Sequence, residues 1–288
     1  MSSNSPRLWV VATPIGNLGD MSPRAKLILG QADLILAEDT RVAGQLLHRL
    51  DLQHKGLLSL HAHNEQARVP QVLSQMQQGK SPALISSAGE PLISDPGYLL
   101  IRACRAAGYQ VSPVPGPCAV TAALIASGLP AHPFIFLGFL PRKSGEITGL
   151  LEKFGRLKST LIFFQRKSRL VESLKLAYNV LGDREVCLAR ELTKAHEEVI
   201  SFRLGQWEKM PQVLRGEFTV LLGPGAKSDT KTPDHEVKAI RAREISQGDR
   251  AKQIARKIST QVQGWSTKEV YSLLLQIISE SDPKSSEY

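Results

Sequence analysis

Short apolar runs alternate with longer helical patterns along most of this 288-residue chain, and this alternation is the strongest constraint on its fold. Several runs are apolar throughout, which is typical of strands covered on both faces. Strands that alternate with helices predict an α/β architecture with mainly parallel sheets. The predicted strands are Leu8–Ala12, Leu34–Ala37, Leu57–Leu60, Ala83–Ser86, Gln110–Val114, Thr160–Phe164, Glu185–Ala189 and Glu217–Leu222.

Helix-forming segments lie between these runs. The first begins at Pro23, with Ser22 as its expected N-cap and Gly30 as its expected stop. The other predicted helices are Arg41–Leu50, Gln66–Gln78, Tyr98–Ala107, Ala119–Ser127 and Leu170–Leu181.

We predict three domains: an α/β domain at 1–118, a second α/β domain at 119–225 and a helical domain at 234–288. The run from Leu222 to Pro233 is rich in Gly, Pro, Ser and Thr, which is typical of a linker. Beyond it, Asp249 is an expected helix cap, and Ser266 with Glu269 has capping-box spacing. Two short helices around Gly264 resemble a helix-turn-helix, although such pairs more often serve packing alone.

The chain is basic, with 36 Lys and Arg against 27 Asp and Glu and a formal charge of +9. This surplus favours a polyanionic partner, nucleic acid first, but it fits a solubility surplus equally well. The positive charge is concentrated in residues 141–170, which hold eight basic residues and only two acids. The basic residues are Arg142, Lys143, Lys153, Arg156, Lys158, Arg166, Lys167 and Arg169.

The cysteines and the apolar segments favour a soluble, cytoplasmic protein. Cys104, Cys118 and Cys187 form no CxxC motif, and their odd number argues against a disulfide framework. No signal peptide is recognisable in the first residues. Residues 106–141 carry no Lys, Arg, Asp or Glu, but six prolines divide them into pieces too short to span a bilayer.

Five consecutive predicted strands end in Gly, Pro or polar residues. Ligands bind beyond the carboxyl ends of strands in open parallel sheets, so these ends predict one binding crevice. Taken singly, each segment is more often a structural turn. The chain has no GxGxxG and no GxxxxGK[ST] motif, which disfavours a dinucleotide fingerprint and a P-loop. His61, His63 and Glu65 fit no standard metal spacing, so we expect no metal.

Read together, six segments resemble the ribosomal RNA small subunit methyltransferase I family of the tetrapyrrole-methylase-like superfamily. The resemblance is close over about residues 8–225 and weaker in the tail. The segments occur in the family's order: Ala12-Thr-Pro-Ile-Gly-Asn-Leu-Gly-Asp20, Ala37-Glu-Asp-Thr-Arg41, His63-Asn-Glu65, Ser94-Asp-Pro-Gly97, Pro115-Gly-Pro117 and Arg190-Glu-Leu-Thr-Lys194.

The resemblance implies two α/β domains of the tetrapyrrole-methylase type with a small C-terminal helical domain. It implies a homodimer that binds S-adenosyl-L-methionine in the cleft between the α/β domains. The implied reaction is methylation of a cytidine ribose 2′-hydroxyl in the decoding region of 16S rRNA, on the small ribosomal subunit.

The resemblance also implies roles for individual residues. The implied donor-binding residues are Thr13, Pro14, Ile15, Gly16, Asn17, Ser87, Ala88, Gly89, Pro91, Ser94, Asp95, Pro115, Gly116 and Pro117. The RNA side of the cleft would include Glu38 and Glu191, and the expected RNA-binding cations are Arg41, Arg142, Lys143, Arg166, Lys167, Arg169, Arg190 and Lys194. Asp39, His63 and Glu65 are unranked candidates for the catalytic base.

The chain departs from the family pattern at Ser87, Glu90 and Gln165, where the family usually has other residues. These departures keep open a second hypothesis, a non-catalytic relative that binds RNA or the ribosome. A third hypothesis is a methylase of the same superfamily that acts on a tetrapyrrole or another small molecule. Such an enzyme would need neither the basic segment at 141–170 nor the helical tail.

Overall fold

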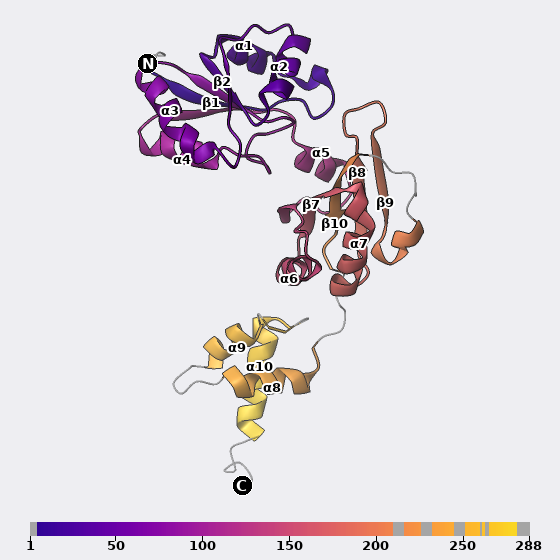
Figure 1. Ribbon diagram of the computed structural model, residues 1–288. Coiled ribbons are helices and arrows are strands. Elements are labelled where there is room, and N and C mark those ends of the chain that lie inside the picture. Colours follow the sequence, from indigo (N-terminus) through magenta and orange to yellow (C-terminus); the bar gives the residue numbers. More distant parts are fainter. Residues whose placement is uncertain are drawn as a thin grey trace, which may run out of the picture. The chain divides into compact units, whose positions relative to one another are not determined.

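The computed structural model of the chain describes residues 5–209, 216–225, 232–244, 251–259, 261–262 and 265–280. Contacts divide the chain into two compact units, Met1–Gly225 and Ala226–Tyr288 (Figure 1). The first unit contains both β-sheets, and helices are the regular structure found in the described residues of the second. Within the described part of the chain, no helix is long and apolar enough to cross a membrane.

The first sheet is wholly parallel, as predicted, and its five strands lie in the order β3-β2-β4-β1-β5. Parallel pairing brings the carboxyl ends of all five strands to one edge, which we call the first carboxyl edge. The strands are β1 (Arg7–Val11), β2 (Leu34–Ala37), β3 (Leu57–Ser59), β4 (Pro82–Ile85) and β5 (Gln110–Val114).

Helices cover both faces of this sheet, which explains why its strands are apolar throughout. Helices α1 (Pro23–Gln31) and α2 (Thr40–Arg49) pack with Ile35 and Ile85 on one face. Helices α3 (Glu65–Gln77) and α4 (Tyr98–Ala106) pack with Leu36 and Leu84 on the other. The predicted N-cap of α1 is confirmed, because the Ser22 hydroxyl accepts a hydrogen bond from the Ala25 amide at 3.1 Å.

The second sheet is mixed, and the prediction of mainly parallel strands is wrong for it. Its order is β6-β7-β10-β8-β9, and only the β6–β7 pair is parallel. Strands β8 and β9 are joined by a short loop without the helical crossover that parallel neighbours need. The strands are β6 (Phe134–Phe139), β7 (Thr160–Arg166), β8 (Glu185–Arg190), β9 (Glu198–Arg203) and β10 (Glu217–Leu222).

Three helices cover the two faces of the second sheet. Helix α5 (Ala119–Ala126) packs with Ile162 and Leu221 on one face. Helices α6 (Ser144–Gly155) and α7 (Lys167–Leu181) pack with the fully buried side chain of Phe163 on the other. Strands β6, β7 and β8 end at one edge, where β9 and β10 begin, and we call it the second carboxyl edge. Short 3₁₀ segments at Leu18–Asp20 and Leu204–Lys209 complete the first unit.

The second unit has an apolar core of its own between α8 (Asp234–Glu244), α9 (Ala251–Ser259) and α10 (Thr267–Glu280). The predicted capping box is confirmed, because the Ser266 amide donates to the Glu269 carboxylate at 2.7 Å and the Glu269 amide donates to the Ser266 hydroxyl at 3.2 Å. The predicted cap Asp249, the break at Gly264 and residues 226–231 of the linker lie outside the described residues.

Candidate functional site

Hydrogen bonds join three loops at the first carboxyl edge. The amides of Thr13, after β1, and Gly89, after β4, each donate to the other's carbonyl, at 3.0 and 3.1 Å. The amide of Gly116, after β5, donates to the Glu90 carboxylate at 3.0 Å. Three of the segments predicted to bind the donor therefore converge at one place on the sheet.

Glycine is required at two points where these loops meet. A Cβ atom on Gly116 would lie 2.8 Å from the Cβ of Ala12, closer than carbon atoms can approach without a shift of backbone. Gly89 has a φ of +83°, and its Cβ would lie 3.1 Å from the Ile15 side chain. The edge thus presents backbone with little side chain in front of it.

The segment after Pro91 has an unusual backbone. Leu92 and Ser94 have φ values of +71° and +74°, a left-handed conformation that costs free energy for residues with a Cβ. Gly97 follows with φ +130° and is the N-cap residue of α4. The Ser94 hydroxyl lies 3.7 Å from the position that a Cβ on Gly138 of β6 would take. This segment therefore lies against the second sheet.

The loop Thr13–Asn17 also contacts the second carboxyl edge. The Asn17 amide donates to the Thr193 hydroxyl at 3.1 Å, and Ile15 packs against the apolar cluster beneath α5. A Cβ on Gly16 would lie 2.9 Å from the Leu192 carbonyl oxygen, so only glycine permits this approach. The carboxyl edges of the two sheets thus meet at this loop.

The loop after β8, whose Thr193 hydroxyl accepts the Asn17 amide, has a strained backbone conformation. Glu191 and Thr193 have φ values of +49° and +67°. The Thr193 amide donates to the Glu197 carboxylate at 2.6 Å, and Lys194 pairs with Glu191 at 3.0 Å. These bonds fix the Thr193 hydroxyl where it accepts the Asn17 amide.

The three candidates for a catalytic base have different surroundings. Asp39 caps α2 and pairs with Arg41 at 2.7 Å, and these hydrogen bonds lower the pKa of its carboxyl to about 2. Glu65 is buried and accepts a hydrogen bond from the Leu100 amide at 3.1 Å. His63 is exposed, and its ring lies 6.1 Å from the half-buried ring of His61. The roles predicted for these three residues stay predictions.

Asp95, among the predicted donor-binding residues, has a perturbed carboxyl group. Burial, together with a smaller effect of the nearby charge of Glu38, raises its pKa to about 6. The group lies after β4, and Glu38 lies after β2, the neighbouring strand. Two carboxyl groups therefore face the same part of the first carboxyl edge.

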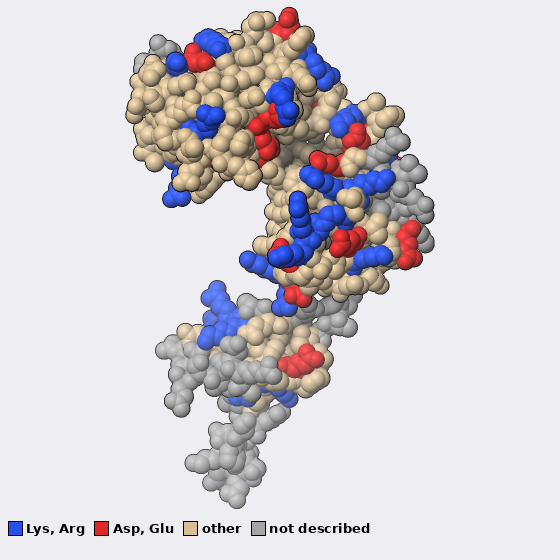
Figure 2. Space-filling view, viewed as in Figure 1, with Lys and Arg blue, Asp and Glu red and all other residues tan. Residues whose placement is uncertain are grey.

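Most predicted RNA-binding cations lie on the second sheet, and Figure 2 shows Lys and Arg gathered over β7 and α7. Arg142, Lys143, Arg166 and Lys167 are exposed around the ends of β6 and β7. Other predicted cations have protein partners: Arg169 with backbone carbonyls, Arg190 with Glu198, Lys194 with Glu191 and Arg41 with Asp39.

Two residues that hold the site together could not be assigned a role from the sequence. Glu90 departs from the family pattern, yet it connects the loops after β4 and β5. Thr193 lies within one of the family's motifs, but its positive φ has no sequence signal because it is not a glycine. Within the described residues, no group of three His, Cys, Asp or Glu side chains is placed to hold a metal ion.

Comparison with known proteins identifies similar sequences over nearly the whole chain. Residues 7–208 match the family model described as Tetrapyrrole (Corrin/Porphyrin) Methylases. The ribosomal RNA small subunit methyltransferase I of Escherichia coli O157:H7 is 40% identical over 274 residues, which cover 94% of this chain and 95% of that protein. The protein of the same name from Vibrio cholerae is 47% identical over 71% of each chain.

Solved structures share the fold at lower identity. Diphthine synthase matches 76% of this chain and 90% of its own with a TM-score of 0.61 and 14% identity. The methyltransferase CobJ matches 77% of this chain and 95% of its own with a TM-score of 0.59 and 21% identity. At such identities, the likeness supports the two-sheet fold of the first unit alone.

We expect the substitution Gly116→Ala to destabilise the protein, because the new methyl group would overlap Ala12. Overpacking of this kind typically costs about 1–3 kcal/mol. Gly30→Ala is the matched control, since nothing lies within 4 Å of its added Cβ and alanine favours the helix. Urea unfolding of both variants measures the difference. Equal stability of the two variants would contradict the close contact described here.

Asp95 gives a pH-dependent prediction. Its pKa rises from an ordinary value near 3.8 to about 6 on folding, so the folded state favours the neutral acid. The stability that this group contributes below pH 3.8 is therefore lost as the pH rises through 6. We expect Asp95→Asn to match the wild-type free energy of unfolding at low pH and to exceed it at pH 7.

Urea unfolding at a series of pH values measures this difference, with the exposed Asp20→Asn as the matched control. The control should show no such gain between low pH and pH 7. An Asp95→Asn variant that is equally or less stable than the wild type at pH 7 would contradict a raised pKa of Asp95 in the folded protein.

Proposed function

The chain belongs to the ribosomal RNA small subunit methyltransferase I family, within the tetrapyrrole methylases, and from this premise we propose that it methylates 16S rRNA. The methyl donor is S-adenosylmethionine. The acceptor that the sequence resemblance implies is the ribose 2′-hydroxyl of a cytidine in the decoding region. The observation that carries the proposal is the identity to the Escherichia coli relative, which extends over nearly the whole chain.

The loops of the first carboxyl edge fit a nucleoside-sized, cationic donor. Gly89 and Gly116 leave the backbone open to close approach, and the carboxyl groups of Glu38 and Asp95 favour a nearby positive charge. The backbone of Thr13–Asn17, Ser87–Asp95 and Pro115–Pro117 would hold the donor. When bound, its sulfonium group supplies an electrophilic methyl group.

Methyl transfer to a ribose oxygen is an in-line displacement, so the main task of the chain is alignment. The hydrogen bond from the Asn17 amide to the Thr193 hydroxyl, and the close approach that Gly16 permits, hold the loop Thr13–Asn17 against the second sheet, where the exposed cations lie. This arrangement supports a site in which one sheet holds the donor and the other orients the RNA.

Deprotonation of the 2′-hydroxyl is the second task, and the three base candidates differ in how well they suit it. Asp39, with a pKa of about 2 and a partner in Arg41, is a weak proton acceptor near neutral pH. Glu65 is buried and caps α4 through the Leu100 amide. His63 is exposed, and imidazole is the commonest general base in enzymes, so we favour His63.

Two of the departures from the family pattern have structural roles that preserve the site. Glu90 binds the Gly116 amide and thereby connects two loops. Gln165 is buried, donates to the Ser173 hydroxyl at 2.6 Å and accepts the Arg166 amide at 2.9 Å. Ser87 is exposed, and nothing in the structure explains its departure. Glu90 and Gln165 are therefore compatible with an intact site, and the assay below distinguishes an active enzyme from the non-catalytic alternative.

The proposal also includes the domain boundaries, the cellular location and the oligomeric state that the sequence leads us to expect. We propose the domain boundaries 1–118, 119–225 and 234–288 and a cytoplasmic location, where ribosomes are available. A homodimer is supported by exposed apolar side chains around the start of α4, at Ile93, Tyr98 and Leu99, of which Tyr98 is 63% exposed. Large apolar side chains grouped on a surface are typical of association sites.

The decisive assay supplies the purified chain with S-adenosylmethionine labelled in its methyl group and with small ribosomal subunits that lack the modification. We expect label in 16S rRNA, in a nucleoside that nuclease digestion and mass spectrometry identify as 2′-O-methylcytidine. Subunits that already carry the modification are the control and should accept no label.

Other outcomes distinguish the alternatives. If the chain binds both the donor and the subunits but no label appears in the RNA, the result would support loss of activity. Binding of subunits without any binding of the donor, measured by calorimetry, would support the non-catalytic relative. Label transferred to a tetrapyrrole but not to RNA would support the small-molecule methylase.

A further inference from the structure

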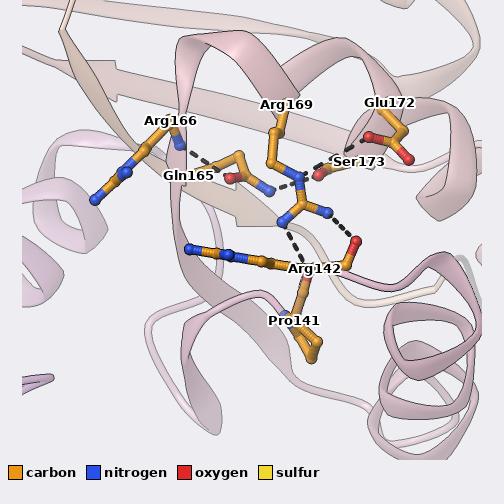
Figure 3. A network of polar contacts seen from close by, with 7 residues as sticks. All are labelled: Pro141, Arg142, Gln165, Arg166, Arg169, Glu172 and Ser173. Atoms are coloured by element: carbon orange, nitrogen blue, oxygen red, sulfur yellow. Dashed lines mark hydrogen bonds and ion pairs between the residues drawn. The ribbon is translucent and has the colours of Figure 1, made fainter.

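One arginine of the basic segment has its guanidinium group turned toward the protein. Arg169, near the start of α7, donates from Nη1 to the Pro141 carbonyl at 2.9 Å and from Nη2 to the Arg142 carbonyl at 2.7 Å (Figure 3). Its Nε lies 3.9 Å from a carboxylate oxygen of Glu172. Arg169 therefore holds the chain that leaves β6 against the first turn of α7.

The buried side chain of Gln165 holds the end of β7 in place. Its carbonyl oxygen accepts a hydrogen bond from the Arg166 amide at 2.9 Å, and its own amide nitrogen donates to the Ser173 hydroxyl at 2.6 Å. Arg142 and Arg166 thus both extend from backbone that another side chain holds in place. Because β6 and β7 are parallel and pair Phe139 with Phe164, both arginines leave the same edge of the sheet.

The two side chains are available for a ligand. Figure 3 shows Arg142 and Arg166 extending to the same side, away from the network that fixes their backbone. Both are exposed, and among the described residues neither guanidinium group has an ion pair or a side-chain hydrogen bond. The carboxylates nearby are Glu146, which pairs with Lys143 at 3.5 Å, Glu172, and Glu217, which lies opposite Arg166 in the sheet.

We propose that Arg142 and Arg166 form a preorganised clamp for the phosphates of the RNA backbone, and that Arg169 is the positioning residue that holds Arg142 in it. A guanidinium group binds phosphate through two parallel hydrogen bonds, and its affinity rises when the backbone that carries it is already held in place. The identity of the ligand as RNA rests on the proposed function. The clamp and the role of Arg169 rest on the contacts described above.

RNA fits this surface better than a single anion does. Lys143 and Lys167 directly follow the two arginines in the chain, so four basic residues border the ends of β6 and β7. A row of cations matches a chain of regularly spaced phosphates, with backbone contacts that position the RNA and leave base recognition to other parts of the site. An acidic protein segment is the competing ligand, and binding of polyglutamate under the same conditions is the probe for it.

The test measures binding of the full-length protein to an RNA fragment of the decoding region over a series of KCl concentrations. We expect Arg142→Ala and Arg166→Ala each to raise Kd by about tenfold, and to reduce the slope of log K against log salt by about 0.7–0.9 per lost contact. Both side chains are exposed, so thermal melting should show little change in fold stability for either variant.

The variant Arg169→Lys keeps the charge but cannot span both carbonyl groups. If Arg169 acts through Arg142, we expect Arg169→Lys to raise Kd by roughly three- to tenfold alone and by less than about twofold in an Arg142→Ala background. In the methylation assay it should raise KM for the RNA and leave KM for S-adenosylmethionine unchanged. A general loss of structure would not produce this separation.

Arg203→Lys is the matched control. Arg203 clamps Asp183 through Nε at 2.9 Å and Nη2 at 3.1 Å, at the opposite edge of the same sheet, and should not alter RNA binding. If the wild type binds the RNA and neither Arg142→Ala nor Arg166→Ala changes its Kd, the clamp is overturned and the proposed function stands. Equal effects of Arg169→Lys in both backgrounds would overturn its positioning role. A wild-type protein that binds polyglutamate and no RNA would overturn the proposed function as well.

Discussion

The contact between the Thr13–Asn17 loop and residues Leu192–Lys194 is the constraint on which the organisation of the first unit depends. The loop begins at the end of a central strand of one sheet and packs against the edge of the other through Ile15, Gly16 and Asn17. Because the amide and the carbonyl of Thr13 both pair with Gly89, the position of this loop also fixes the loop after β4. Glu90 extends the same constraint to Gly116. One short loop thereby sets the geometry of both carboxyl edges.

Carboxyl groups gather at the first carboxyl edge and exposed arginines at the second, although each edge also carries charges of the opposite sign. Glu38, Asp39 and Asp95 follow strands of the first sheet, where Arg41 pairs with Asp39. Arg142 follows β6 and Arg166 ends β7, and Glu191 follows β8 at the same edge. A cationic methyl donor and a polyanionic RNA prefer opposite environments, which supports our proposal that the first sheet receives the donor and the second receives the RNA. The price is repulsion within the acidic group, and the raised pKa of Asp95 reflects it together with burial.

The first sheet was predictable because helices cover both its faces and its strands are apolar throughout. Strand β6 was missed because prolines precede it and Gly138 interrupts it, and β9 because it is a half-exposed edge strand with charged ends. Helices α6 and α8 lie where charge and glycine obscure the helical period. In the site, the loops were predictable from their composition. The partners of Glu90, Thr193 and Arg169 were not, because each bond joins segments distant in sequence or depends on backbone conformation.

We propose that loops of the first sheet hold the methyl donor while they stay fixed to the second sheet. Hydrogen–deuterium exchange of the full chain, measured with and without S-adenosylhomocysteine, can test this arrangement. We expect slower exchange in peptides that contain Thr13–Asn17 and Ser87–Asp95, with coupled protection at Leu192–Lys194 and none in β9. Protection confined to the helical unit, or absent from both loops after β1 and β4, would contradict it.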